Sequence, residues 1–120
     1  MTAPSHRPRS WLAFNGALCA AAAVALGAYA AHAVEGAAQS RLQLAAVFAF
    51  GHGLALAALA PAATRRLGRF ALWLLYLGVL LFCGSLVFNV LAEWPTALAP
   101  TGGMLLIAGW LLYAAESLRH

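Results

Sequence analysis

The chain has 120 residues, which is enough for one domain. Its hydrophobic fraction is 64% and its charged fraction is 8%, against about 25% charged residues in an ordinary soluble domain. A soluble fold could not bury so much apolar surface, so the composition excludes an ordinary soluble globular protein. The net charge is +4, but the arginines are divided among the ends and short connections without forming a basic face, which argues against nucleic acid as a partner.

Four stretches without a charged side chain divide the sequence, and all of the charges lie outside them. A bilayer core of about 30 Å needs roughly 20 apolar helical residues to cross it, and each stretch is that long. The sequence therefore predicts an all-α membrane protein with the lipid bilayer as its surroundings. We expect a four-transmembrane-helix bundle with short loops, occupying residues 11–118. The stretches are 10–34, 42–64, 70–92 and 94–115.

The N-terminal part allows two interpretations. Residues 1–10 are polar and contain two prolines, so we expect a disordered cytoplasmic tail. Arginines before an apolar run, followed by small residues near position 30, outline a secretory signal peptide. The run is nearer to the length of a membrane span than to the 7–15 residues of a signal core. We therefore expect an uncleaved first helix over 11–33, with cleavage as the alternative.

Three further helices are expected over 42–60, 70–92 and 100–118. Pro61 and Gly68 punctuate the connection after the second helix. Pro95 disfavours helix in the residue before it and so ends the third. Pro100 suits the first turn of the fourth helix, where its missing N–H is not needed.

The arginines predict the orientation. If the chain crosses four times, the N-terminus, the second loop and the C-terminus share one side and carry six of the seven arginines, whereas the opposite side carries only Arg41. The excess of basic residues on the cytoplasmic side of membrane proteins predicts a multi-pass protein of the inner (plasma) membrane with both termini cytoplasmic.

His52 is the first candidate for a functional side chain. It lies near the middle of an uncharged stretch, between Gly51 and Gly53. An ionisable group at that depth is a candidate for proton transfer or substrate contact. The alternative is a neutral imidazole that hydrogen-bonds a neighbouring helix, with Ser85 of the third helix as a possible partner at similar depth.

A second set of polar residues is expected at the outer end of the bundle. His32 ends the first helix, Glu35 and Arg41 follow in the loop, and Asn89 is near the end of the third helix. Such groups could bind a lipid headgroup or a small polar ligand. The alternative is that they cap helix ends and pair with one another.

The parts of a catalytic or metal site are missing from the sequence. It contains no Asp, no pair of carboxylates within a span and no short-range histidine spacing typical of a zinc or haem site. No phosphate-binding glycine motif surrounds Gly102-Gly103. The two cysteines, Cys19 and Cys83, are expected to be free thiols inside the spans. We therefore predict no enzyme, no cofactor and no metal.

Several segments resemble a known family. The segments LGAYAAHAVE, FAFGHGLAL, LFCGSLVFNVL and LAPTGGMLLIAGWLLYAA are similar to "LGAFGAHGL", "YQMYHALAL", "LFSGSLYLL" and "ITPIGGxxFIxGW" of the small, uncharacterised YgdD/YwdK-type inner-membrane proteins, a family that includes the eukaryotic transmembrane protein 256. The resemblance implies a four-span membrane protein without an established biochemical role. It places His52 on the family's histidine, and the remaining matched positions are His32, Gly84, Ser85, Pro100, Gly102, Gly103, Gly109 and Trp110.

The matched glycines and Pro100 are expected to serve close helix packing, because small residues let membrane helices approach one another. We therefore expect an interaction, scaffold or accessory subunit that binds itself as a homo-oligomer or a larger membrane complex. A small transporter or proton-conducting module centred on His52, with Ser85 and Asn89 lining the path, is the alternative. A lipid-modifying enzyme that uses His32 and the outer loop is a weaker one. The packing positions are Gly84, Pro100, Gly102, Gly103 and Gly109.

Overall fold

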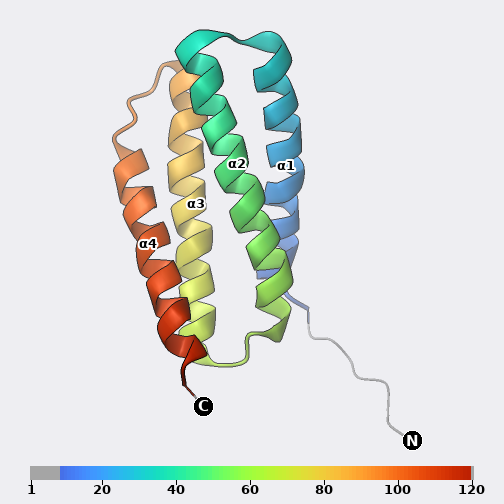
Figure 1. Ribbon diagram of the computed structural model, residues 1–120, viewed down its shortest axis with the longest axis vertical. Coiled ribbons are helices and arrows are strands. Elements are labelled where there is room, and N and C mark those ends of the chain that lie inside the picture. Colours follow the sequence, from blue (N-terminus) through green and yellow to red (C-terminus); the bar gives the residue numbers. More distant parts are fainter. Residues whose placement is uncertain (1–8, 120) are drawn as a thin grey trace, which may run out of the picture.

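A computed structural model describes residues 9–119. These residues form four long helices and one short 3-10 turn (Figure 1). Each long helix is long and apolar enough to cross a membrane, so the protein is an all-α membrane protein with four transmembrane helices and short loops, as the sequence predicted. The elements are α1 (Trp11–Ala33), α2 (Gly36–Leu59), η1 (Ala60–Ala62), α3 (Arg66–Ala92) and α4 (Leu98–Ser117).

Two helices begin before the charge-free stretches that predicted them. The sequence predicted a loop before residue 42 and a third helix from residue 70, but α2 begins at Gly36 and α3 begins at Arg66. Alanine, glutamine and arginine are good helix formers, and a charge at the level of the headgroups does not break a helix. The charge-free stretches therefore mark the apolar core of the membrane, while the helices continue beyond it.

Local chemistry explains where the helices begin and end. Ser10 caps α1, since its side-chain oxygen accepts a hydrogen bond from the Ala13 N–H at 3.1 Å; the remainder of the tail predicted over 1–10 lies mostly outside the described residues. Glu93 ends α3 with a left-handed backbone, at φ 56°. Pro100 lies inside the first turn of α4 rather than at its start, a position that proline tolerates.

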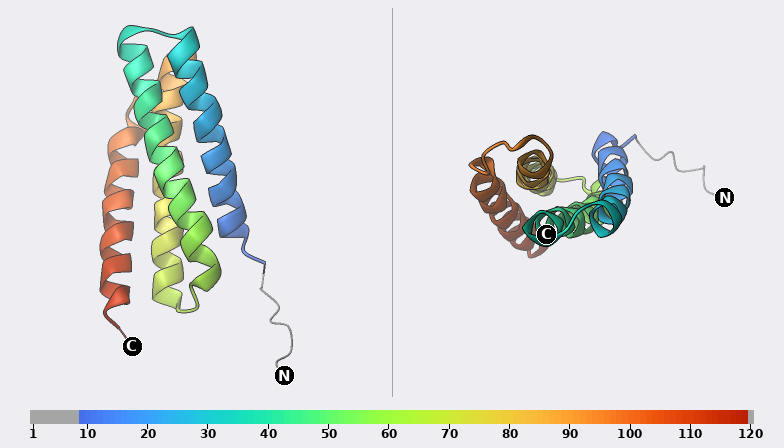
Figure 2. Two further views of the ribbon diagram at one scale, coloured as in Figure 1. Left: turned by 45° about the vertical axis from the view of Figure 1, so that its right-hand side comes forward. Right: turned by 90° about the horizontal axis from the view of Figure 1, so that it is seen from above.

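The four helices make two hairpins that lie side by side. α1 packs on α2 and α3 packs on α4, while α2 and α3 join the two pairs. As a result, α1 and α4 lie at opposite sides of the molecule (Figures 1 and 2). The core between the hairpins consists of leucine and valine side chains, of which Leu56, Leu72, Leu75 and Val79 are almost completely buried.

Glycines bring the two helices of each hairpin into backbone contact. A Cβ added to Gly53 of α2 would lie 2.5 Å from the carbonyl oxygen of Gly16 in α1. A Cβ added to Gly102 of α4 would lie 2.5 Å from the backbone nitrogen of Phe82 in α3. Only a residue without a side chain fits at such crossings, and close approach of this kind is how membrane helices associate without a hydrophobic drive.

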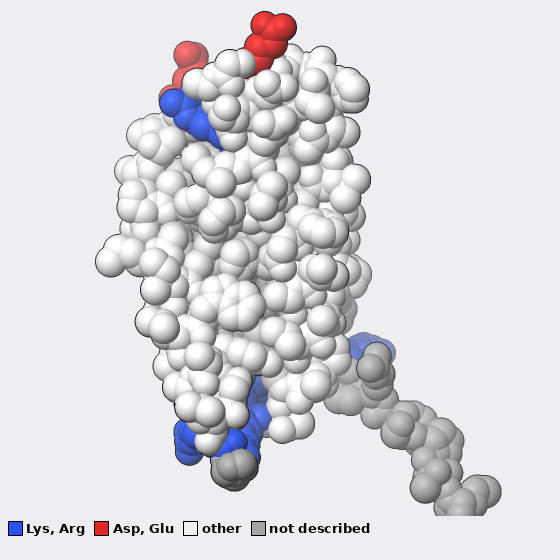
Figure 3. All heavy atoms as spheres, viewed as in Figure 1, with Lys and Arg blue, Asp and Glu red and all other residues white. Residues whose placement is uncertain are grey.

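The charges separate along the long axis. Five of the described arginines lie at the end that holds the N-terminus of α1 and the C-terminus of α4, and Arg41 lies at the opposite end with Glu35 and Glu93. Figure 3 shows a broad uncharged surface between these two ends. We call them the arginine-rich end and the acidic end.

Candidate functional site

His52 hydrogen-bonds a tryptophan of the other hairpin. The indole Nε1–H of Trp110 in α4 donates to His52 Nε2 at 3.0 Å. His52 Nδ1 lies 2.9 Å from the carbonyl oxygen of Phe48, one turn earlier in α2. An indole N–H is only a donor and a carbonyl oxygen only an acceptor. The pair of bonds therefore fixes a neutral ring with its proton on Nδ1.

Aromatic rings surround His52. The Phe48 ring stacks on the imidazole with centroids 5.7 Å apart, and Phe48 also contacts Phe82 of α3 at 4.7 Å. The centroid of the Trp110 ring lies 5.8 Å from that of the imidazole. Three helices thus contribute to the surroundings of one histidine, whose polar atoms are both satisfied inside the membrane.

An apolar groove opens beside this pair, between α2 and α4. The backbones of these helices do not pack closely within residues 9–119, which leaves a hollow of about 610 Å³ with α3 behind it. We call it the α2–α4 groove. His52 and Trp110 provide its few polar side-chain atoms. Gly103 leaves open space in the wall of the groove, because a Cβ added there would lie 4.0 Å from its nearest neighbour, an atom of the Phe82 ring. Its lining residues are Phe48, His52, Phe82, Gly103, Leu106, Ile107, Trp110 and Leu111.

Ser85 is buried, but it does not hydrogen-bond His52. Its Oγ has no hydrogen-bond partner in the described structure, and His52 uses Trp110 and Phe48 instead. The suggested Ser85–His52 pair is therefore wrong. Sequence reasoning missed Trp110 as the partner, although an indole N–H in an apolar setting needs an acceptor and the histidine offers one at a compatible depth.

Asn89 has a structural role at the end of α3. Its Nδ2–H donates to the carbonyl oxygen of Trp94 at 2.9 Å, and the rings of Phe88 and Trp94 stack at 4.9 Å. The hydrogen bond and the ring contact hold the loop that follows α3 against the end of the helix. Asn89 does not line a path toward His52.

The outer polar cluster does not assemble into a compact site. His32, Glu35 and Arg41 are exposed, and no ion pair joins them within residues 9–119. The contact that ties the α1–α2 turn is instead the Gln39 Nε2–H, which donates to the carbonyl oxygen of Ala30 at 3.0 Å. Across the described residues, no group of three or more His, Cys, Asp or Glu side chains could hold a metal ion.

The four glycines among the expected packing positions divide into two sets. Gly102 lies against the backbone of α3 at a distance that excludes a side chain, and Gly109 lies close to the Leu75 side chain of α3. An added Cβ at Gly84 would meet nothing within 4 Å, and Gly103 faces the α2–α4 groove. Gly84 and Gly103 therefore do not pack the bundle internally, and their surfaces are free within the described structure.

Two further hydrogen bonds join the hairpins. The Tyr76 hydroxyl of α3 donates to Asn15 Oδ1 of α1 at 3.2 Å. The Cys83 thiol of α3 donates to the carbonyl oxygen of Ala45 in α2 at 3.2 Å. Both cysteines are free thiols. Together with Trp110–His52, these bonds connect the hairpins at three places.

At the arginine-rich end, Glu116 faces the start of α3. Its Oε1 lies 3.4 Å from Arg65 Nη1, and its side chain is 13% exposed. Its Oε2 is buried without a hydrogen-bond partner in the described structure. The sequence analysis missed this contact, which a carboxylate at the end of the last span and an arginine cluster between the second and third helices could have suggested.

Four apolar helices and few internal polar groups define a small polytopic membrane protein. Comparison with known sequences gives its family: the model described as "Protein of unknown function (DUF423)" matches residues 26–103, and the chain belongs to this family. The membership confirms the expectation that the chain belongs to an uncharacterised family of membrane proteins.

Relatives of similar length are known as membrane proteins. The chain is 37% identical over 105 residues to a UPF0382 membrane protein of Staphylococcus haemolyticus, covering 81% of this chain and 86% of that protein. It is 36% identical over 112 residues to a UPF0382 membrane protein of Staphylococcus epidermidis, covering 87% of this chain and 92% of that protein. No solved structure matches the chain significantly.

Proposed function

We propose that this protein is a non-catalytic interaction subunit of the membrane, which binds a transmembrane helix of a second copy or of a larger complex in the α2–α4 groove. The observation that carries the proposal is the groove itself, with a volume of about 610 Å³ and an almost entirely apolar lining. Its two walls are helices that pack on α3 but not closely on each other.

Gly103 supports a helix as the occupant. It leaves a place in the wall of the groove where another backbone could approach, and small residues at such places drive helix association in membranes. The His52–Trp110 bond has a supporting role in this proposal, because it holds the two walls at a fixed separation across the open side of the bundle.

Photo-crosslinking in native membranes tests the proposal. A photoreactive residue at Ile107, inside the groove, is expected to give a discrete crosslinked protein band. The matched control is Met104, which is also exposed on α4 but does not line the groove, and it is expected to give none. Crosslinking of Ile107 to lipid alone would count against the proposal.

A proton-conducting module centred on His52 is the weaker alternative. Both ring nitrogens are already engaged, and an imidazole protonated on both nitrogens could not accept the Trp110 N–H. Ser85 and Asn89, the expected lining of the path, contact neither nitrogen. Proton flux into liposomes by the wild type and His52→Ala discriminates the two functions. Flux that disappears with His52→Ala would favour the alternative.

A further inference from the structure

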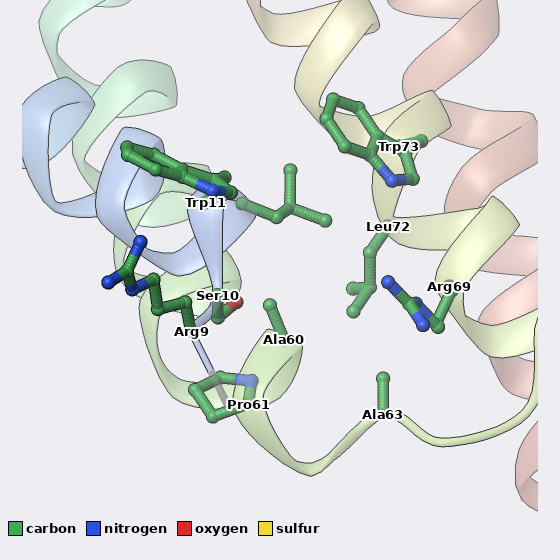
Figure 4. Close-up of a pocket in the computed structure, with 10 residues that line it drawn as sticks. Arg9, Ser10, Trp11, Ala60, Pro61, Ala63, Arg69, Leu72 and Trp73 are labelled. Atoms are coloured by element: carbon green, nitrogen blue, oxygen red, sulfur yellow. The ribbon is translucent and has the colours of Figure 1, made fainter. Parts of the chain in front are cut away.

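The arginine-rich end contains a second cavity, which is unlike the α2–α4 groove. It lies between the start of α1, the η1 turn and the first turns of α3, with a volume of about 210 Å³ (Figure 4). Arg9 and Trp11 border it on one side, Arg69 and Trp73 border it on the other, and Leu72 lies at its inner wall.

This cavity has an excess of positive charge. Arg9 and Arg69 both line it, and no acidic residue does. The only ion pair in the described part of the chain joins Arg65 to Glu116, in a neighbouring hollow. Neither Arg9 nor Arg69 therefore has a carboxylate partner within residues 9–119.

Backbone groups add to this charge. Ser10 satisfies the Ala13 N–H, but the Trp11 and Leu12 N–H groups belong to the first turn of α1 and have no acceptor within the helix. The N-terminus of a helix carries a partial positive charge and favours anions. Two arginines and a helix N-terminus thus border one space.

A hydrogen bond joins α1 and α3 about one turn farther into the membrane than the two tryptophans. Asn15 follows Trp11 by one turn of α1, Tyr76 follows Trp73 by about one turn of α3, and their side chains hydrogen-bond at 3.2 Å. The two tryptophans are exposed at the sides, at 63% and 48%. Tryptophan favours the level of the lipid headgroups, which places the cavity at the membrane surface rather than in the aqueous phase.

We propose that this cavity binds the phosphate group of an anionic phospholipid. Arg9 and Arg69 bind the phosphate oxygens, because guanidinium groups match phosphate with paired hydrogen bonds. Trp11 and Trp73 contact the glycerol and upper acyl region beside it. Basic pockets between membrane helices are a recurring way to bind anionic headgroups. This site is independent of the α2–α4 groove.

Native mass spectrometry of the detergent-purified protein tests the proposal. The protein is titrated with an equimolar mixture of phosphatidylglycerol and phosphatidylcholine, and the lipid adducts are counted. The wild type is expected to prefer phosphatidylglycerol, and Arg9→Gln/Arg69→Gln is expected to bind it about 30-fold more weakly. The matched control, Arg66→Gln/Arg119→Gln, removes the same charge from the same end outside the cavity and is expected to keep the preference.

A single variant and a competition with inorganic phosphate separate loss of the site from misfolding and from binding of a soluble anion. Arg9 precedes α1 and is exposed, so the single Arg9→Gln variant is expected to fold normally and to show a partial loss. Inorganic phosphate at millimolar concentration distinguishes a soluble anion from a lipid, and it is expected to leave the phosphatidylglycerol adducts in place. Complete displacement by inorganic phosphate, equal binding of the two lipids, or equal loss in both double variants would overturn the proposal.

Discussion

His52 makes two hydrogen bonds that together suit only a neutral imidazole. Its Nδ1 faces the carbonyl oxygen of Phe48, and its Nε2 accepts from Trp110. An unpaired polar atom is costly in an apolar environment. Each of the two bonds therefore avoids the cost of an unpaired ring nitrogen in the membrane. A histidine that first suggests proton transfer is here a link between the two hairpins.

A double-mutant cycle measures the strength of this link. We expect the variants His52→Leu and Trp110→Phe to show a coupling free energy of about 0.6–1.7 kcal/mol, which is the range for hydrogen bonds between membrane helices. The measurement is reversible unfolding in mixed detergent micelles. Trp94→Phe in place of Trp110→Phe is the control, since Trp94 lies beyond α3 and does not contact His52. Zero coupling between His52 and Trp110 would contradict the account.

The hairpins depend on glycine at the helix crossings. Gly16 and Gly53 meet backbone to backbone between α1 and α2, while Gly102 meets Phe82 between α3 and α4. Within one helix, some glycines face a neighbour and others face open space. Gly51 and Gly53, two positions apart in α2, are an example.

This pair of glycines gives a matched test of helix packing. Alanine favours helix over glycine by about 1 kcal/mol, so Gly51→Ala is expected to be neutral or stabilising. Gly53→Ala gains the same propensity but places its Cβ against the backbone of Gly16. Overpacking costs about 1–3 kcal/mol, so we expect it to destabilise the protein. Thermal unfolding in detergent compares the two, and equal stabilities would show that the crossing is not tightly packed.

The sequence predicted the four helices because apolar length is a strong signal, but it did not predict which glycines pack. Gly102 and Gly103 are adjacent, yet only Gly102 meets the backbone of α3, and this difference depends on the rotation of α4 about its axis. The Trp110–His52 bond depends in the same way on how two separate helices lie side by side. The arginine-lined cavity joins Arg9 to Arg69, which only the folded chain brings together.

The separation of charge along the molecule indicates its orientation. The arginine-rich end holds five described arginines and Glu116, whereas the acidic end holds two glutamates and Arg41. Since basic residues concentrate on the cytoplasmic side, we expect the arginine-rich end, with both termini, to face the cytoplasm.

Labelling of introduced cysteines tests the orientation in intact cells. On a background without Cys19 and Cys83, a cysteine at Ala37, which is exposed, is expected to react with a membrane-impermeant maleimide from outside. A cysteine at Thr64 is expected to react only after the membrane is opened. The reverse labelling pattern would show that the arginine-rich end faces the outside, which contradicts the prediction.

The two hairpins leave an open side, and the proposed role of the protein depends on what fills it. Substitutions at Ile107 and Met104 separate the groove from the rest of the α4 surface, because both side chains are exposed but only Ile107 lines the groove. The decisive measurement is the yield of the crosslinked protein band in native membranes with Ile107→Trp and with Met104→Trp, using a photoreactive residue at Leu111. The account predicts that Ile107→Trp fills the groove and abolishes the band, while Met104→Trp retains it. Equal yields from the two variants would contradict it.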